Sequence, residues 1–123
     1  MKFTARVDFS GLNKVINKRG LRKYGKTQIF IDSEVLRVCD PYVPKRSGTL
    51  KESGNTFTVP GSGEVEYNTP YAKRQHRENA GRGEGGTRHG GLRGKHWFER
   101  AMIDHKDDIL EGAAKVAGGR RRG

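Results

Sequence analysis

The chain has 123 residues, of which 32% are hydrophobic, and its 25 basic and 14 acidic side chains give a net charge of +11. This length predicts one domain over residues 1–123 with a thin core, so we expect burial against partner subunits to complete its stability. A single cysteine excludes an internal disulfide, and the lack of any apolar run near the roughly 18 residues of a membrane span favours a soluble protein made in a cytoplasm.

The positive charge is spread over both halves of the chain. Such a surface attracts polyanions, and nucleic acid is the first candidate. The alternative is that the lysines and arginines are merely solvated. The even distribution favours a broad electropositive face over a single binding arm.

The first third of the chain predicts a strand and two helices. Residues 2–9 alternate apolar and polar side chains, which is the period of a half-buried strand. Ser10 then caps a short helix that ends near Gly20. Residues 21–39 have helical spacing, and an Asp-Pro pair ends this long helix. Its apolar positions are Leu21, Tyr24, Ile31, Val35 and Val38.

The stretch 42–75, called the punctuated stretch below, contains turn-forming and helix-capping residues at several positions. Pro44 biases Val43 to extended geometry, so any preceding helix has ended before this point. Thr49 is then placed to cap a short turn of helix that carries Leu50 and Ser53. The first part of this stretch therefore predicts an extended entry into a short helix.

The second part of the stretch predicts a hairpin and another short helix. Residues 55–59 and 64–67 have the composition of two strands, and the connection Pro-Gly-Ser-Gly between them is typical of a hairpin. Thr69 is a good cap, and Pro70 suits the first helical position of a basic helix over 71–77.

Residues 79–94 form a Gly/Arg-rich segment with seven glycines among sixteen residues. Its backbone entropy is high and it has almost nothing apolar to bury, so we expect no packed structure in isolation. A neighbouring subunit is the simplest agent to order it. Transient contact with nucleic acid and plain disorder are the alternatives.

The last helix is predicted over residues 95–117, followed by a basic tail at 118–123. Its apolar stripe is Phe98, Ala101, Met102, His105, Ile109, Ala113 and Val116. The order of elements predicts the α+β class: a small antiparallel sheet packed against a long helix in the N-terminal half and a C-terminal helix, with the Gly-rich loop as an insertion. We expect Tyr71 and Trp97 to be buried aromatic anchors, each contributing roughly 3 kcal/mol.

No group of residues has the spacing of a catalytic or metal site. His89 and His96 lie too far apart for a zinc pair, and Cys39 lies among apolar residues, the context of an inert buried thiol. His105 is interpreted as a core or interface histidine. The last helix carries the acidic cluster Asp104, Asp107, Asp108 and Glu111. Paired carboxylates can hold magnesium, but a solvated acidic face, or one that docks on a basic neighbour, is the favoured interpretation.

Three groups of residues occur in an order that resembles the small minor capsid proteins of long-tailed phages. They are Tyr-Val-Pro with Ser-Gly-Thr-Leu at 42–50, Tyr-Asn-Thr-Pro-Tyr-Ala at 67–72, and the aromatic-led helix that starts at His96. The resemblance extends in order over about residues 20–117. These minor capsid proteins are in turn similar to the wider tail-completion, or neck, group. Residues 78–94 depart from it.

The resemblance implies a structural protein of the virion at the head–tail junction, assembled as a homo-oligomeric ring that joins head to tail and lets DNA pass. Its implied partners are the connector or stopper and tail-tube proteins, with non-specific contact to DNA in the channel. It implies no enzyme activity, catalytic residue, cofactor, metal or membrane. The alternative is a small basic protein that binds nucleic acid non-specifically; a nuclease would need a ligand set that the sequence does not offer.

The candidate site residues follow from the punctuated stretch, the Gly-rich loop and the tail. The candidates for a subunit interface are Tyr42, Pro44, Leu50, Tyr67, Tyr71, Gln75, Arg82, Arg88 and Arg93. The candidates that would face DNA are Arg120, Arg121 and Arg122.

Overall fold

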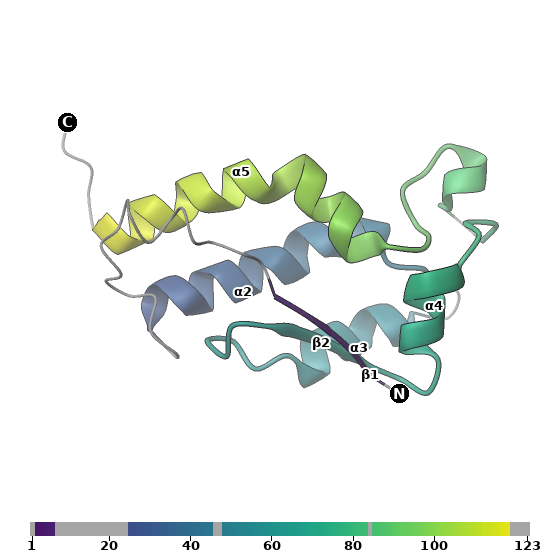
Figure 1. Cartoon of the computed structure of the whole chain (residues 1–123), viewed down its shortest axis with the longest axis horizontal. Coiled ribbons are helices and arrows are strands. Elements are labelled where there is room, and N and C mark those ends of the chain that lie inside the picture. Colours follow the sequence, from purple (N-terminus) through teal and green to yellow (C-terminus); the bar gives the residue numbers. More distant parts are fainter. Residues whose placement is uncertain (1, 7–24, 46–47, 84, 119–123) are drawn as a thin grey trace.

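A computed structural model of the chain describes residues 2–6, 25–45, 48–83 and 85–118. Two long helices, α2 (Lys26–Cys39) and α5 (Trp97–Gly118), lie side by side and run in opposite directions (Figure 1). Their apolar stripes face each other, because helical spacing puts the buried residues of each helix on one side. Both helices therefore confirm the sequence prediction over most of their length.

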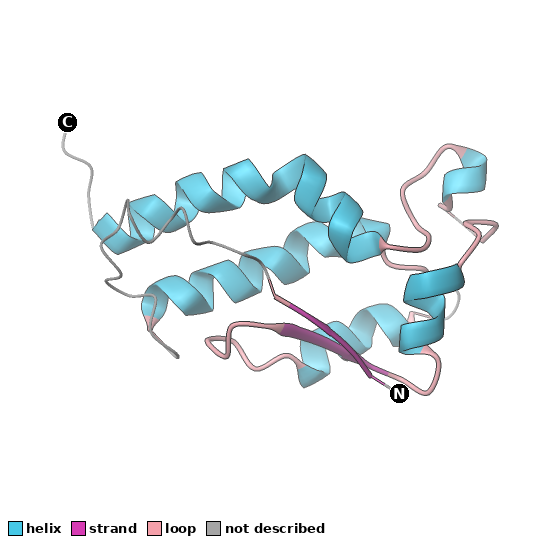
Figure 2. Ribbon diagram, in the orientation of Figure 1, coloured by secondary structure: helices cyan, strands magenta, loops and turns pink. Residues whose placement is uncertain are grey.

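A two-stranded antiparallel sheet lies beside this helix pair (Figure 2). It pairs β1 (Lys2–Ala5) with β2 (Val65–Asn68), with Phe3 opposite Tyr67. Helix α3 (Thr49–Phe57) packs on β2, and the short helix α4 (Ala72–Glu78) contacts β1. The fold is α+β, as predicted.

The predicted hairpin over residues 55–67 is wrong. Residues 55–57 of its first strand are instead the end of α3, and β2 pairs with β1 from the N-terminal part of the sequence. Side chains explain the change: Ser53 donates to the carbonyl of Leu50 and accepts from the amide of Asn68, which fastens α3 to β2. Tertiary contacts of this kind override the local preference of a few residues for a strand.

Close backbone approach also holds α3 against the sheet. A Cβ added at Gly54 would lie 2.5 Å from Cε2 of Tyr67, so only glycine lets the helix come this near to the ring. The ring of Tyr67 in turn meets that of Trp97 edge-on at 5.4 Å. Trp97 is completely buried and belongs to a single cluster of buried residues drawn from α2, α3, β2, α4 and α5.

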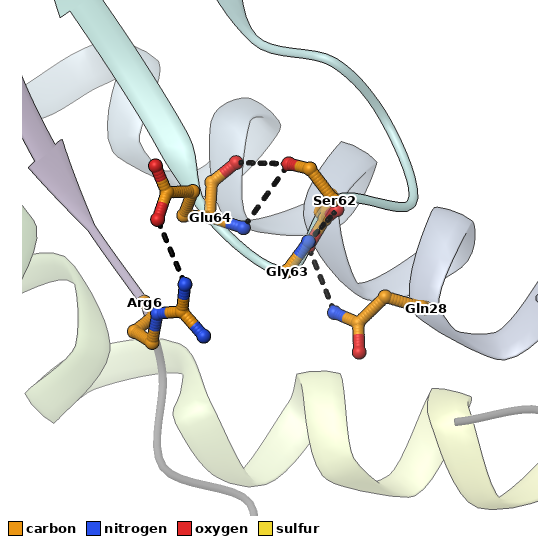
Figure 3. Close-up of polar contacts among 6 residues, drawn as sticks. Arg6, Gln28, Ser62, Gly63 and Glu64 are labelled. Carbon is orange, nitrogen blue, oxygen red and sulfur yellow. Dashed lines mark hydrogen bonds and ion pairs between the residues drawn. The ribbon is translucent and has the colours of Figure 1, made fainter. Parts of the chain in front are cut away.

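The predicted turn between residues 60 and 63 does form, but it connects α3 to β2. The buried carboxylate of Asp32, on α2, accepts hydrogen bonds from the amides of Gly61 at 2.7 Å and Gly63 at 3.0 Å. Just beyond the turn, Glu64 pairs with Arg6 at 2.9 Å, which continues the contact of the two strands past their ends (Figure 3). The turn is therefore fixed to the helix pair on one side and to β1 on the other.

Several predicted features lie outside the described residues. They are the end of the first strand at 7–9, the short helix after Ser10, the start of the long helix at 21–24, and Arg120, Arg121 and Arg122. The caps differ slightly from prediction: α3 follows Gly48 and begins at Thr49, and α4 begins at Ala72, two residues after Pro70.

Candidate subunit-binding groove

A surface groove of about 870 Å³ lies between several elements of the described structure. Its walls come from the segment after the short 3₁₀ helix η1 (Asp40–Tyr42), from the start of α3, from α4 and from the Gly-rich loop. Six of the nine interface candidates line it: Pro44, Leu50, Tyr71, Gln75, Arg82 and Arg93. The fold thus brings together residues that are up to 49 positions apart in the sequence.

The groove combines apolar and cationic side chains. Leu50 is buried, while Tyr71 is 38% exposed and contributes an accessible aromatic surface. Lys45 and Arg82 are exposed, and no carboxylate is among the described residues that line the groove. The expected anchor role of Tyr71 inside the core is therefore wrong, since its ring is partly available to a ligand.

Arg93 ties the Gly-rich loop to the body of the domain. Its guanidinium donates hydrogen bonds to the backbone carbonyls of Asp40 at 2.7 Å and Val43 at 2.6 Å. These carbonyls lie around η1, at the C-terminal end of α2, where a cation also complements the helix dipole. The amide of Gly94 adds a bond to the carbonyl of Tyr42 at 3.1 Å. This wall of the groove is therefore built by long-range contacts.

The loop also has hydrogen bonds of its own. The amide of Thr87, in the 3₁₀ turn η2 (Thr87–His89), donates to the carbonyl of Arg93, and the amide of Arg88 donates to that of Gly81, both at 2.9 Å. A Cβ at Gly86 would lie 2.1 Å from the carbonyl oxygen of Gly81, so glycine permits this close packing of backbone on backbone. Within the loop, backbone hydrogen bonds therefore satisfy polar groups that have no apolar core around them. That a neighbouring subunit orders the loop stays a prediction.

Tyr42, the first interface candidate, lies inside the domain. Its hydroxyl donates to a carboxylate oxygen of Asp104 at 2.5 Å, and its ring meets that of His105 edge-on. Burial, together with the bond to Asp104, raises the pKa of Tyr42 to about 12. Its side chain therefore joins η1 to α5 and does not form part of the surface.

The other candidates lie away from the groove. Tyr67 is buried against Trp97, and burial raises the pKa of its hydroxyl. Arg88 is exposed on η2 but does not line the groove. The site residues predicted from the sequence include the Gly-rich loop as a segment, but they do not name Lys45 or Asn79, which also line the groove. Only the position of Lys45 beside Pro44 could have drawn attention to it.

A second polar cluster lies between α4 and the start of α5. Nε2 of the buried His76 is 2.8 Å from a carboxylate oxygen of Glu99, and the ring stacks on Phe3 at 3.9 Å. Burial lowers the pKa of His76, against the opposing effect of Glu99. This histidine therefore helps to join β1, α4 and α5.

Cys39 is fully buried, and burial raises the pKa of its thiol to about 12. Such a thiol is protonated and inert at neutral pH. Within the described ranges, no three His, Cys, Asp or Glu side chains are arranged to hold a metal ion. No helix in the same part of the chain has the length and apolar character needed to cross a membrane.

Comparison with known proteins gives one finding. No curated protein and no solved structure matches the chain. A family described as minor capsid protein matches residues 3–117, which is nearly all of the sequence and includes both long helices, the sheet and the groove. The chain therefore belongs to this family of phage minor capsid proteins, a structural class of virion proteins.

Proposed function

We propose that this minor capsid protein acts at the head–tail junction, where copies form a ring that joins head to tail and lets DNA pass. The observation that carries the proposal is the groove, because the two segments that resemble the tail-completion group, residues 42–50 and 67–75, both contribute to it. A concave surface with apolar and charged side chains is suited to hold a neighbouring protein. Connector or stopper and tail-tube proteins are the proposed neighbours above and below the ring.

The positive charge supports a place beside DNA. A net charge of +11 attracts a polyanion that passes nearby, without any need for base contacts. The role is structural and involves no catalytic step, in keeping with a family of capsid proteins. The same charge is the observation that favours the second candidate, a small basic protein that binds nucleic acid non-specifically.

Removal of the gene from the phage tests the proposal. Tailless heads and free tails should accumulate, and imaging of wild-type particles should locate the protein as a ring at the neck. Native mass spectrometry of purified necks gives the number of copies. Complete particles without the protein, or its location on the capsid lattice, would contradict the proposed place.

A further inference from the structure

The chemistry of the groove defines what would fill it. An apolar side chain would contact Leu50, Pro44 and the exposed part of Tyr71, and carboxylates beside it would face Lys45 and Arg82. A bound segment should therefore present one apolar residue surrounded by acidic ones. Charge complementarity of this kind fixes the register of two protein surfaces.

The chain presents such a surface on the outer side of α5. Ile103 is 82% exposed, more than any other large hydrophobic residue in the described part of the chain. Asp107 and Glu111 follow it at successive four-residue steps on the same helix face, and both are exposed. Four of the fourteen acidic residues of this basic chain lie between positions 104 and 111.

We propose that the α5 face formed by Ile103, Asp107 and Glu111 of one copy docks in the groove of the next copy. Ile103 would contact the apolar wall, and the two carboxylates would pair with Lys45 and Arg82. The contact joins two different surfaces of the same chain, so each copy can give one and receive one. A contact of this type closes into a ring when the rotation between copies allows it. The inference rests on the proposed ring and names its interface.

The arrangement of the chain is compatible with this contact. Helix α4 and the Gly-rich loop lie at one end of the molecule, whereas α5 runs from that end to the opposite one (Figure 1). None of the acidic residues of α5 lines the groove. The two surfaces are therefore separate on one copy and can be occupied at the same time.

A protein segment fits the groove better than nucleic acid. Phosphate would be attracted to Lys45 and Arg82, but it has no apolar part for Leu50 and Pro44, and Arg93 is already bonded to backbone carbonyls. An exposed isoleucine flanked by carboxylates satisfies both kinds of side chain. Binding of DNA in the groove is the outcome that would replace this proposal.

Charge reversal on each surface separately provides the test. One variant carries Asp107→Lys and Glu111→Lys; the other carries Lys45→Glu and Arg82→Glu. Each variant keeps one native surface, so neither should associate with itself. In a mixture the altered helix of the first matches the altered groove of the second, and the two native surfaces also match. Self-association, measured by sedimentation and native mass spectrometry, should be lost in each variant alone and restored in the mixture.

Two further variants sharpen the result. Ile103→Asp should weaken association at least about tenfold, because it places a charge at the centre of the contact. Arg88→Glu is the matched control: it reverses a charge in the same loop outside the groove and should leave association unchanged. If the wild-type chain stays monomeric at every concentration reached, the two charge-reversal variants are compared in particle assembly, each alone and expressed together.

The outcomes separate the interface from the function. If particles contain a ring but the mixed variants neither associate nor assemble, the interface is wrong and the ring remains. If particles contain no ring, the proposed function fails as well. If Lys45→Glu with Arg82→Glu abolishes DNA binding and leaves self-association intact, the groove binds nucleic acid instead.

Ile103→Cys with Ala80→Cys should let a short bis-maleimide link neighbouring copies in particles, whereas either cysteine alone should not.

Discussion

At the scale of single residues, the two aromatic residues expected to be anchors behave differently. Trp97 is completely buried among rings from β1, β2 and α4, whereas Tyr71 is 38% exposed at the edge of the groove. The sequence placed both at the start of a helix and could not separate them. Exposure depends on which elements cover the helix, and that is a tertiary property.

Alanine substitution should show this difference. Trp97→Ala should lower the free energy of unfolding by about 3–5 kcal/mol, because it leaves a large cavity in the core. Tyr71→Ala should cost about 1 kcal/mol or less, as expected for a partly exposed side chain. Urea unfolding monitored by far-UV circular dichroism measures both. Equal losses in the two variants would mean that Tyr71 is as buried as Trp97.

A second prediction at this scale concerns His76 and pH. Burial lowers its pKa in the folded state below that in the unfolded chain, so the unfolded chain binds the proton more readily. This contribution to stability is therefore complete above the unfolded pKa and decreases as the pH falls through that value towards the lower folded pKa. The urea midpoint should decline between about pH 7.5 and pH 5.

The variant His76→Phe isolates this contribution, since a phenyl ring can still stack on Phe3 but cannot titrate. Its urea midpoint should depend less on pH than that of the parent. His89→Gln is the control, because His89 is exposed on η2 and lies outside the buried cluster. An identical pH dependence in parent and His76→Phe would show that His76 does not supply it.

At the scale of elements, helical spacing was sufficient for α2 and α5, because each long helix buries one stripe that repeats over several turns. The short elements were harder to predict from the sequence. Residues 55–57 have a composition that suits a strand, yet the bonds of Ser53 and the approach of Gly54 to Tyr67 hold them in α3. A contact between α3 and β2 cannot be read from local composition.

For the candidate groove too, the sequence predicted the segments involved but not the contacts between them. Turn and cap residues identified the segments that form it, including Pro44 and Gln75. The sequence could not tell which side chains of those segments point inward, so Tyr42 and Tyr67 were included although both are buried. Nor could it show that Arg93 would bond to carbonyls some fifty residues earlier in the chain.

The Gly-rich loop gives a prediction at this scale. Arg93→Ala removes both bonds to the carbonyls of Asp40 and Val43, and hydrogen bonds to charged groups contribute about 1.5–3 kcal/mol each. Amide exchange at Thr87 and Arg88 should therefore become at least about tenfold faster, while α2 and α5 keep their protection. Arg88→Ala, at an exposed position, should leave the loop amides unchanged. Loop amides that already exchange freely in the parent would contradict the structure of this loop.

At the scale of the whole molecule, the net charge and the groove contribute to binding in different ways. The charge of +11 is a property of the entire surface and acts at a distance. The groove acts only on contact and selects its ligand by shape. A protein at a DNA channel can use both, with the groove holding a neighbour and the remaining basic surface facing the channel.

The last prediction separates these two roles. Binding to free duplex DNA should be weak and independent of sequence, and it should decrease steeply with salt, because release of counterions from phosphates is its only source. Replacing Arg120, Arg121 and Arg122 together by alanine should reduce the slope of log affinity against log salt by about 3, because each removed arginine leaves one phosphate without its cation. Titrations with two unrelated DNA sequences at low and physiological salt measure this. Affinity that depends on sequence and reaches about 10⁻⁸ M at physiological salt would instead identify a specific DNA-binding protein.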